Sequence, residues 1–330
     1  MRIATKKEII EALSGIDLVA EMEKAFVAYS RGLAVVPPVG EMILEKGEVH
    51  IKYGYIRGDK YYLIKIASGF YKNQDNGLPN GNGMILLFDQ ETGVPSHILL
   101  DEGHLTDLRT AAAGALAAKH FAPENIVCIG IIGTGVQARL QLELLKEVTS
   151  CRDVIAWGRD KAKTIAFRDD VRQSDFTCDF ADSPRELASS SNLIVTTTAS
   201  KIPLLTLSDI KPGTHITAIG SDTPEKQELA EDLIRGADLV VADSISQSKL
   251  RGEIFKANDS DAASPVEALE LGDAIANDRC YQNDGSQITI TDLTGVAVQD
   301  IKIANAVVRK LGEPEEFRPE VFRPEGFQVP

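Results

Sequence analysis

The stretch Ile126–Ala138, I-V-C-I-G-I-I-G-T-G-V-Q-A, constrains the fold of this chain more than any other. Seven mostly apolar residues, 126–132, run into a glycine turn, and a leucine-rich periodic segment follows, which predicts a buried strand, a tight turn and a helix. In such a unit one glycine makes the turn, a second lets the backbone approach a pyrophosphate, and a small residue after them permits close packing of helix on strand. A helix that begins there also directs unpaired N–H groups and the positive end of its dipole at phosphates.

The glycine pattern by itself is weak, because a turn between any strand and helix can look the same. Here the sequence on both sides fits, so we interpret the stretch as a dinucleotide-binding turn. The residues expected to contact the cofactor in it are Gly133, Thr134, Gly135, Val136, Gln137 and Ala138.

From this turn onward, strand-like apolar runs alternate with helix-like segments. Further strands are expected at residues 154–157, 193–197, 215–219, 239–242 and 288–291. Strands that alternate with helices at this spacing predict an α/β fold with a Rossmann-type, doubly wound parallel sheet.

The first hundred residues follow a different pattern. Helical periodicity covers residues 5–32, where Thr5 and Asp17 are suitable N-cap residues for two successive helices. Strand candidates separated by turn residues are found at 49–56, 61–67, 84–88 and 97–100. This order predicts an α+β unit with an antiparallel or mixed sheet.

An alanine-rich segment, T-D-L-R-T-A-A-A-G-A-L-A-A-K-H, begins at Thr106 and predicts a helix with this threonine as its N-cap. Its many small side chains allow close packing, as expected where two domains meet. The length of 330 residues also suggests two domains. We expect one domain over residues 1–115, to which 305–330 return, and a dinucleotide-binding domain over 116–304.

The end of the chain has two parts. Residues 296–311 predict a long amphipathic helix that can return to pack on the first domain. The remaining tail is too rich in proline for a helix or a central strand. It is expected to lie over a surface such as a subunit interface.

Composition limits the partners of the chain. With 35 Lys and Arg against 49 Asp and Glu, the net charge is −14, which argues against nucleic acid or an anionic membrane but not against a small anionic substrate. The four cysteines lack paired or metal-ligand spacing, and Cys128 falls in a predicted buried strand, so we expect no metal site and a reducing, cytoplasmic setting. The N-terminus lacks the apolar core of a signal peptide, and no apolar run is long enough to span a bilayer.

The choice between the two nicotinamide cofactors normally depends on an acid at the end of the second strand. Here that strand continues as W-G-R-D-K-A-K, with Gly158 in place of the acid and Arg159 after it. A missing carboxylate and an added guanidinium suit a 2′-phosphate, so NADP(H) is favoured, while NAD(H) is possible. The alternative is that Asp160 takes the role of the acid and the nearby basic residues are solvated.

Further segments surround this core. They are I-K-I-A-S-G-F-Y-K-N-Q-D-N-G-L-P (64–79), L-T-D-L-R-T-A-A-A-G (105–114), G-T-H-I-T-A-I-G-S-D-T-P-E-K-Q-E-L (213–229) and I-T-D-L-T-G-V-A-V-Q-D (290–300). Together with G-T-G-V-Q-A they closely resemble the ornithine cyclodeaminase and mu-crystallin family over nearly the whole chain. The resemblance implies hydride transfer at the α-carbon of an amino or imino acid, and a homodimer built through a first domain that also holds the substrate.

The resemblance assigns roles to three residues. Lys65 matches the family's active-site lysine, Arg109 the arginine that grips the substrate carboxylate, and Asp222 the aspartate near the substrate nitrogen. These residue types suit the roles, because a guanidinium binds a carboxylate through two parallel hydrogen bonds, whereas lysine and aspartate can exchange protons. Taken without the resemblance, they are more often a rim lysine, a surface arginine and a turn residue.

Lys52 departs from the cyclodeaminase pattern, because the resemblance suggests a glutamate at this position in ornithine cyclodeaminases. A cation here repels the amino end of ornithine and can instead bind a carboxylate. His50 shares a face of the strand with Lys52 and can add a donor, or it can be a buried neutral histidine. Two further pairs of residues are expected beside the cofactor. Thr197 and Thr198 resemble the loop beside the adenine ribose, and Thr294 and Gly295 resemble the segment near the nicotinamide.

Three hypotheses of function follow. The first is an NAD(P)H-dependent imine reductase or amino-acid dehydrogenase acting on a small substrate such as Δ1-pyrroline-2-carboxylate, iminosuccinate or the imine of pyruvate. The alternative is an ornithine cyclodeaminase, an ammonia lyase that uses NAD catalytically and forms proline. The third is a non-catalytic protein that binds NADPH and a ligand, as implied by some mu-crystallins.

Overall fold

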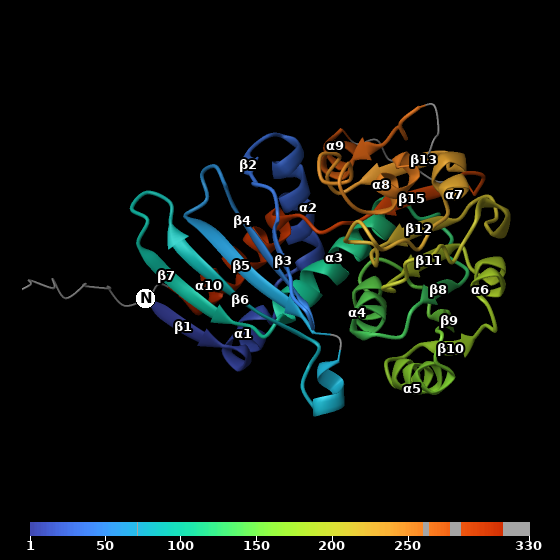
Figure 1. The fold of residues 1–330 in the computed structure, drawn as a ribbon, viewed down its shortest axis with the longest axis horizontal. Coiled ribbons are helices and arrows are strands. Elements are labelled where there is room, and N and C mark those ends of the chain that lie inside the picture. The colour runs from blue at the N-terminus through green and yellow to red at the C-terminus, as the bar shows by residue number, and fades with distance from the viewer. Residues whose placement is uncertain (71, 260–263, 278–284, 313–330) are drawn as a thin grey trace, which may run out of the picture.

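Two sheets organise the molecule, and the computed structural model describes residues 1–70, 72–259, 264–277 and 285–312 of it. Figure 1 shows one sheet at the left, formed by the first hundred residues, and a second at the right, wrapped by the later helices. Helix α3 (His104–Phe121) joins the two. The tail after residue 312, and Cys280, lie outside the described residues.

The first sheet is mixed, as the sequence predicted. Its strands lie in the order β1-β7-β6-β5-β4-β2, and β3 also pairs with β4. Strands β1 and β7 are parallel and the other pairs are antiparallel. The strands are β1 (Arg2–Thr5), β2 (Ala34–Val35), β3 (Gly40–Ile43), β4 (Glu48–Ile56), β5 (Tyr61–Gly69), β6 (Gly81–Asp89) and β7 (Pro95–Leu100).

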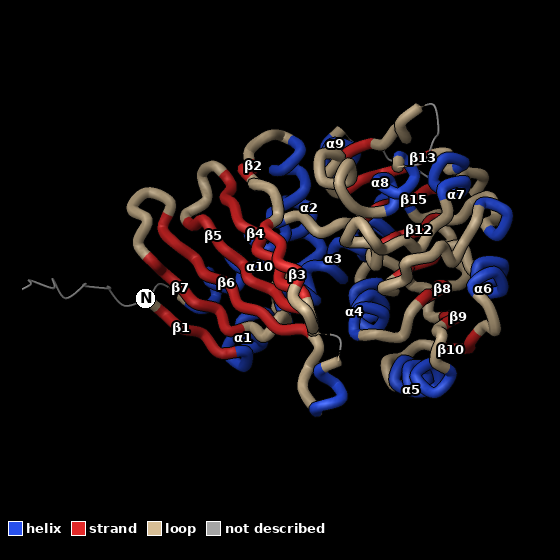
Figure 2. Tube along the Cα trace, in the orientation of Figure 1, coloured by secondary structure: helices blue, strands red, loops and turns tan. Residues whose placement is uncertain are grey.

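Helices cover one face of this sheet. Helix α1 (Lys6–Leu13) starts with a capping box between Thr5 and Glu8, and α2 (Leu18–Ser30) is capped by Asp17, so both predicted caps are confirmed. Helix α10 (Ala297–Leu311) returns from the far end of the chain and packs on α1, α2 and β4. Figure 2 shows these helices behind the strands of the first sheet.

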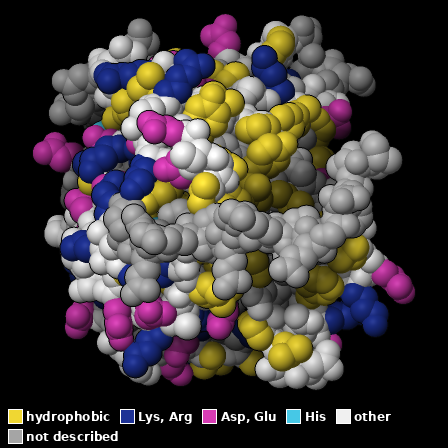
Figure 3. All heavy atoms as spheres, turned by 90° about the vertical axis from the view of Figure 1, so that its left-hand side faces the viewer, with side chains coloured by type: hydrophobic (Ala, Val, Ile, Leu, Met, Phe, Trp, Pro, Cys, Tyr) yellow, Lys and Arg dark blue, Asp and Glu magenta, His cyan; other side chains and the backbone are white. Residues whose placement is uncertain are grey.

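The opposite face of the first sheet is apolar and carries no helix in Figure 1. Because side chains alternate along a strand, one residue in two points away from the helices. Among them Ile3, Tyr53, Met84 and Leu100 are exposed, and the rings of Tyr62 and Phe88 stack. Figure 3 shows hydrophobic side chains gathered over this side of the molecule.

The second sheet is parallel throughout and confirms the Rossmann-type prediction. Its strand order is β10-β9-β8-β11-β12-β15-β13-β14. The strands are β8 (Ile129–Ile132), β9 (Asp153–Trp157), β10 (Thr177–Phe180), β11 (Leu193–Thr196), β12 (His215–Ala218), β13 (Leu239–Ala242), β14 (Leu269–Glu270) and β15 (Thr289–Asp292). The helices around it are α4 (Val136–Leu145), α5 (Lys161–Arg172), α6 (Pro184–Ser190), α7 (Glu231–Gly236), α8 (Glu253–Asn258) and α9 (Leu271–Ala276).

The prediction that α3 lies between the two units is confirmed. Its alanines are buried, and it packs on α2 and α10 on one side and on α4 on the other. A Cβ at Gly114 would lie 2.1 Å from Oε1 of Gln141 in α4, so the glycine permits this approach. Among the described residues, no helix combines the length and hydropathy needed to cross a membrane.

Some local predictions were wrong. Helix α3 is not capped by Thr106: it begins two residues earlier, after Gly103 in the left-handed conformation, and Asp101 accepts the N–H of Leu105. The strand predicted over 126–132 is limited to Ile129–Ile132, so Cys128 lies just before it and is only partly buried. The short strands β1, β2, β3, β10 and β14 were not predicted from the sequence. Of these, β1 pairs with β7, a strand distant in the sequence, whereas the other four pair with nearer strands.

Candidate active site

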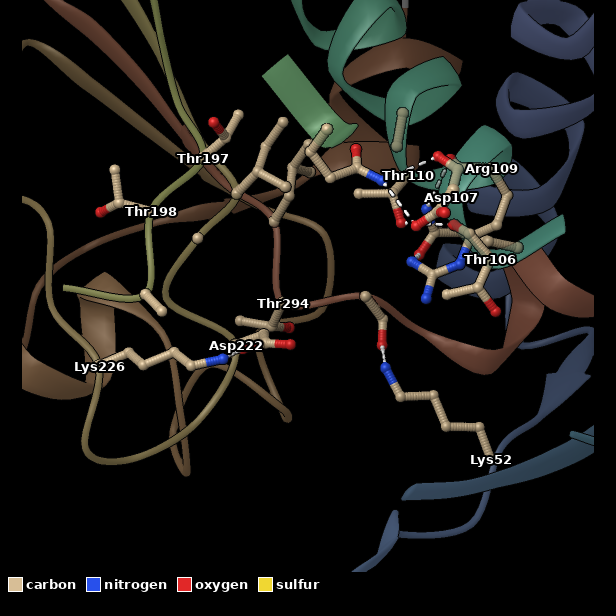
Figure 4. A pocket seen from close by; sticks show the side chains of 18 residues that line it. Lys52, Thr106, Asp107, Arg109, Thr110, Thr197, Thr198, Asp222, Lys226 and Thr294 are labelled. Carbon is tan, nitrogen blue, oxygen red and sulfur yellow. Dashed lines mark hydrogen bonds and ion pairs between the residues drawn. The ribbon is translucent and has the colours of Figure 1, made fainter. Parts of the chain in front are cut away.

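A cavity of about 270 Å³ lies where the two sheets meet, and Figure 4 shows the side chains around it. Strand β4 and helix α3 supply one wall, and the segments that follow β11, β12 and β15 supply the other. Its charged and backbone lining includes Lys52, Asp107, Arg109, Asp222, Lys226 and Gly295.

Three cations converge beside this cavity. In the β4–β5 register Lys52 lies opposite Lys65, so both side chains point to the helix-covered face. Nζ of Lys65 and Nε of Arg109 each donate to the same oxygen of Asp300 in α10, both at 3.1 Å. All four side chains are buried. With both lysines protonated, the cluster holds three positive charges and one negative charge.

Gly295 closes the cluster from the second unit. Its carbonyl accepts a hydrogen bond of 2.6 Å from Lys52, drawn in Figure 4. Its φ is +80°, and a Cβ here would lie 3.0 Å from Arg109 and 3.1 Å from Lys52. Both the backbone conformation and the crowding therefore favour glycine.

Burial and mutual repulsion change the acidity of the cluster. Burial, with the charges of Lys65 and Arg109, lowers the pKa of Lys52 to about 7. Burial also lowers the pKa of Lys65 to about 8, although the charge of Asp300 opposes the shift. For Asp300, burial would raise the pKa, but the charges of Lys65 and Arg109 outweigh it and lower the pKa. The two lysines can therefore exchange protons near neutral pH.

Asp222 faces the cavity from the segment after β12, and 46% of its side chain is exposed there. Its Oδ1 accepts a hydrogen bond of 2.6 Å from Lys226 (Figure 4). Burial tends to raise the pKa of Asp222, but Lys226, Lys52 and His50 outweigh burial and lower it. The carboxylate is thus ionised and placed across the cavity from the Lys52 and Arg109 cations.

A second cavity, of about 230 Å³, continues from the first along the ends of the parallel strands. It is lined by Gly133, Thr134, Gly158 and Arg159, and it shares Thr197 and Thr198 with the first cavity. It opens between β9, β8 and β11, where the strand order of the sheet reverses, which is where open α/β sheets bind ligands.

The glycine turn fits a dinucleotide pyrophosphate. Gly133 has φ +116°, and a Cβ there would lie 2.4 Å from Oγ1 of Thr197, whereas the space at Gly135 is open. Helix α4 begins at Val136 with no side-chain cap from Gly135, so its first N–H groups remain available to an anion. Ala138 is fully buried, as close helix-strand packing requires.

The packing at the end of β9 explains why a glycine, Gly158, stands where an acidic residue is usual. A Cβ at Gly158 would lie 2.8 Å from Cγ2 of Thr134 and 2.9 Å from Oγ1 of Thr164, so a larger residue does not fit without movement. The carboxylate of Asp160 is already engaged, since its Oδ1 caps α5 by accepting two backbone N–H groups. Arg159 lines the cavity beside them.

Not every predicted residue lies on the wall of the first cavity. His50 is not among the lining residues, and its ring lies 3.3 Å from Glu41 and 3.6 Å from Glu48. Lys65 is only 2% exposed and lies behind the wall, bonded to Asp300. Val136 is 60% exposed and lines neither cavity.

Gln137 donates to the main chain and the carboxylate of Asp107, so it ties α4 to α3 while facing the first cavity. Thr294 and Gly295 also line that cavity. The sequence analysis missed Asp300, Asp107 and Lys226. Of these three, Asp300 was the easiest to detect from the sequence, because it places a charge on the apolar face of a predicted amphipathic helix.

A parallel sheet with a glycine turn at its switch point, next to a cationic pocket, is the arrangement of a dinucleotide-dependent enzyme. In agreement, the model of the ornithine cyclodeaminase/mu-crystallin family matches residues 1–314. The chain belongs to this family. It is 40% identical to an uncharacterized cyclodeaminase of Sinorhizobium fredii, over 95% of this chain and 96% of that protein.

Solved structures of similar proteins agree with this family assignment. An archaeal alanine dehydrogenase dimer with bound NAD superimposes with a TM-score of 0.86 at 30% identity, covering 96% of this chain and 99% of that one. The Δ1-pyrroline-2-carboxylate reductase of Thermococcus litoralis, solved with NADH and L-proline, gives a TM-score of 0.87 at 25% identity, over 94% of this chain and 97% of that one. Among the described residues of this chain, no cluster of His, Cys, Asp or Glu is suited to hold a metal ion.

The shared carboxylate of Asp300 leads to a prediction about stability. Asp300→Asn leaves Lys65 and Arg109 buried without their counter-charge, and breaking a buried pair in this way costs about 3–5 kcal/mol. The measurement is the free energy of unfolding from urea titration. Asp59→Asn is the control, because Asp59 pairs with Lys302 in a more exposed place and its loss should cost no more than about 1 kcal/mol. Equal losses for the two variants would contradict the assigned role of Asp300.

Proposed function

We propose that the chain is an NAD(P)H-dependent oxidoreductase that transfers hydride at the α-carbon of a small imino or amino acid. The observation that carries the proposal is the excess of positive charge from Lys52, Lys65 and Arg109 beside the cavity, opposite the ionised Asp222. This pairing of cations and a carboxylate suits a substrate with an α-carboxylate at one end and a cationic nitrogen next to it.

In the proposed mechanism each residue has one task. Arg109 and Lys52 bind the α-carboxylate, and Lys52 gives up the Gly295 carbonyl to do so. Asp222 stabilises the positive charge at the substrate nitrogen. Lys65, with its lowered pKa, can release or take up a proton beside Lys52 and Asp300, behind the cavity wall, while Arg109 stays charged. The nicotinamide, when bound, supplies or accepts the hydride at the α-carbon.

A cyclodeaminase is the second candidate, because family members and the relative from Sinorhizobium fredii carry that name. Lys52 weighs against it, since a buried cation repels the distal ammonium of ornithine. A non-catalytic ligand-binding protein is the third. It has no use for a proton-exchanging lysine with a pKa of about 8, which favours a catalyst.

The function is tested with a panel of substrates. Purified protein is incubated with NADH or NADPH and with cyclic imines, or with α-keto acids plus ammonia or methylamine, and cofactor oxidation is followed by absorbance. We expect oxidation with at least one imino acid, and a loss of at least about 10²-fold in kcat for Asp222→Ala with little change in cofactor binding. Proline and ammonia formed from ornithine without net NADH would instead support the cyclodeaminase.

The lowered pKa of Lys52 predicts a pH dependence. Only the protonated lysine attracts a carboxylate, so kcat/KM for imine reduction should fall as pH rises through about 7. Lys52→Arg keeps the charge at all these pH values, because arginine does not deprotonate. In that variant the fall should move up towards the pKa of Lys65, about 8. An unchanged profile would show that Lys52 does not titrate in substrate binding.

We propose NADP(H) as the preferred cofactor, with NAD(H) as the alternative. Support comes from Arg159 on the adenosine side of the cleft and from the lack of room for an acid at Gly158. Against it, the two solved relatives above contain NAD and NADH.

Arg159→Ala tests the cofactor assignment. The variant should raise the dissociation constant for NADPH by about tenfold or more, since it removes a charge-assisted hydrogen bond, and change that for NADH by less than about twofold. Fluorescence titration measures both constants. Equal weakening of NADPH and NADH would refute the phosphate contact.

The proposal includes a homodimer formed through the open face of the first sheet. Exposed apolar faces of this kind usually mark interfaces, and Ile64, Tyr62 and Phe88 lie on this one. The alanine dehydrogenase of similar fold is described as a dimer. We also propose that the residues divide into domains at 115/116 and 304/305, with the first domain forming the dimer and holding the substrate.

Ile64→Glu tests the dimer by placing a charge in the middle of this face. The native protein should have twice the mass of one chain by light scattering, and the variant should be a monomer. Ile10→Glu, at an exposed position on α1, is the matched control and should remain a dimer. A native monomer, or a dimer that survives Ile64→Glu, would refute this interface.

A cytoplasmic location is also proposed. Cys128, Cys151 and Cys178 are free thiols, and burial raises the pKa of Cys128 to about 12 and of Cys178 to about 11. Free thiols of this kind are usual in a reducing compartment.

A further inference from the structure

Glu228 has a fully buried side chain that joins the ends of two neighbouring strands. Its Oε1 accepts hydrogen bonds from the N–H and the hydroxyl of Thr198, at 2.5 and 2.7 Å. Its Oε2 accepts from the hydroxyl of Thr196 at 2.6 Å and from the N–H of Gly220 at 2.9 Å. One carboxylate therefore holds the segment after β11 and the segment after β12 together.

The two segments that Glu228 joins form one wall of the active-site cavity. Thr198 and Gly220 line it, and Asp222 follows two residues later. The segments approach closely, because a Cβ at Gly220 would lie 2.1 Å from the carbonyl oxygen of Thr198 and 2.5 Å from Glu228. The position of Glu228 therefore decides how far apart these walls lie and where Asp222 is held.

A second buried acid, Glu253, holds the main chain around Glu228. Glu253 accepts the backbone N–H of Glu228 at 2.7 Å and that of Leu229 at 3.1 Å, and the carbonyl of Glu228 accepts the N–H of Leu204. Main chain and side chain of Glu228 are thus both fixed. Burial raises the pKa of Glu228 and of Glu253.

The donors to Glu228 are uncharged, and no salt bridge to it is found in the described part of the chain. Burying an acid without a cation carries a desolvation cost, which the four hydrogen bonds that Glu228 accepts offset. What the carboxylate supplies is geometry, since it offers two acceptor oxygens that fit the two backbone N–H groups at once.

We propose that Glu228 is a positioning residue that sets the nicotinamide half of the cofactor cleft and, through it, the place of Asp222. The inference rests on the proposed dinucleotide-dependent function. The adenosine half is assigned to the cavity beside β9 and the glycine turn. The segment after β11 borders both cavities, whereas the segment after β12 borders only the first, so the wall after β12 and its spacing from the β11 segment remain for the nicotinamide.

Glu228→Gln isolates this role, because glutamine keeps the shape but replaces one acceptor oxygen with an NH₂ donor. Each oxygen of Glu228 faces one backbone N–H, that of Thr198 or that of Gly220. Either orientation of the amide therefore sets a donor against a backbone N–H that cannot turn away, and the two segments must separate.

The experiment compares NADH with ADP-ribose, which lacks the nicotinamide ring. Dissociation constants are measured by calorimetry and by fluorescence of Trp157, the one tryptophan of the chain, which lies in the adenosine cavity. In Glu228→Gln the constant for NADH should rise about tenfold or more, and that for ADP-ribose should change less than about twofold. A loss of folding alone would affect both ligands alike.

Thr196→Val is the second variant, in case Glu228→Gln does not fold. The Thr196 side chain is buried, does not line the cavity, and donates to Glu228, so its loss should weaken NADH about threefold and leave ADP-ribose unchanged. Glu21→Gln is the control for losing a buried acid elsewhere, and its two dissociation constants should match those of the native protein.

The outcomes separate the two ideas. Equal weakening of NADH and ADP-ribose, or no weakening of NADH, in the variants of Glu228 and Thr196 would overturn the role of Glu228 while the function stands. If the native protein bound neither NADH nor NADPH, the proposed function itself would fail, and the role of Glu228 with it. If it bound NADPH alone, the same comparison is made between NADPH and 2′-phospho-ADP-ribose.

Discussion

The charged cluster of the site depends on the carboxylate of Asp300, because Lys65 from the first sheet and Arg109 from α3 both donate to its Oδ1. Without that charge two cations would be buried together, at a cost of about 3–5 kcal/mol. Asp300 belongs to the last helix, so the chain must pass through the second sheet and return before the site exists. This arrangement ties the assembly of the pocket to the completion of both units.

The same return places the segment after β15, residues 293–296, between the two sheets. Gly295 there receives Lys52 from the first unit, and Asp243 in the second unit accepts its N–H. This backbone position therefore joins the two units beside the first cavity.

Prediction from sequence succeeded where the signal is local. The turn at Gly133 and the caps at Thr5 and Asp17 depend on residues a few positions apart, and the alternation of strands and helices depends on periodicity. It failed at Thr106, because the helix start was set by the left-handed Gly103 and by Asp101 upstream. Asp300 and Glu228 went unnoticed as functional residues because their partners lie far away in the chain.

The sequence by itself determined the fold class, the glycine turn and the residue types of the site, since these follow from hydrophobic period, backbone freedom and side-chain chemistry. Only the tertiary structure decided how the charges pair. It set Lys65 behind the cavity wall, left Lys52 and Arg109 facing the cavity, and kept His50 away from it. Those outcomes depend on strand register and on the return of α10, and neither can be inferred from neighbours in the sequence.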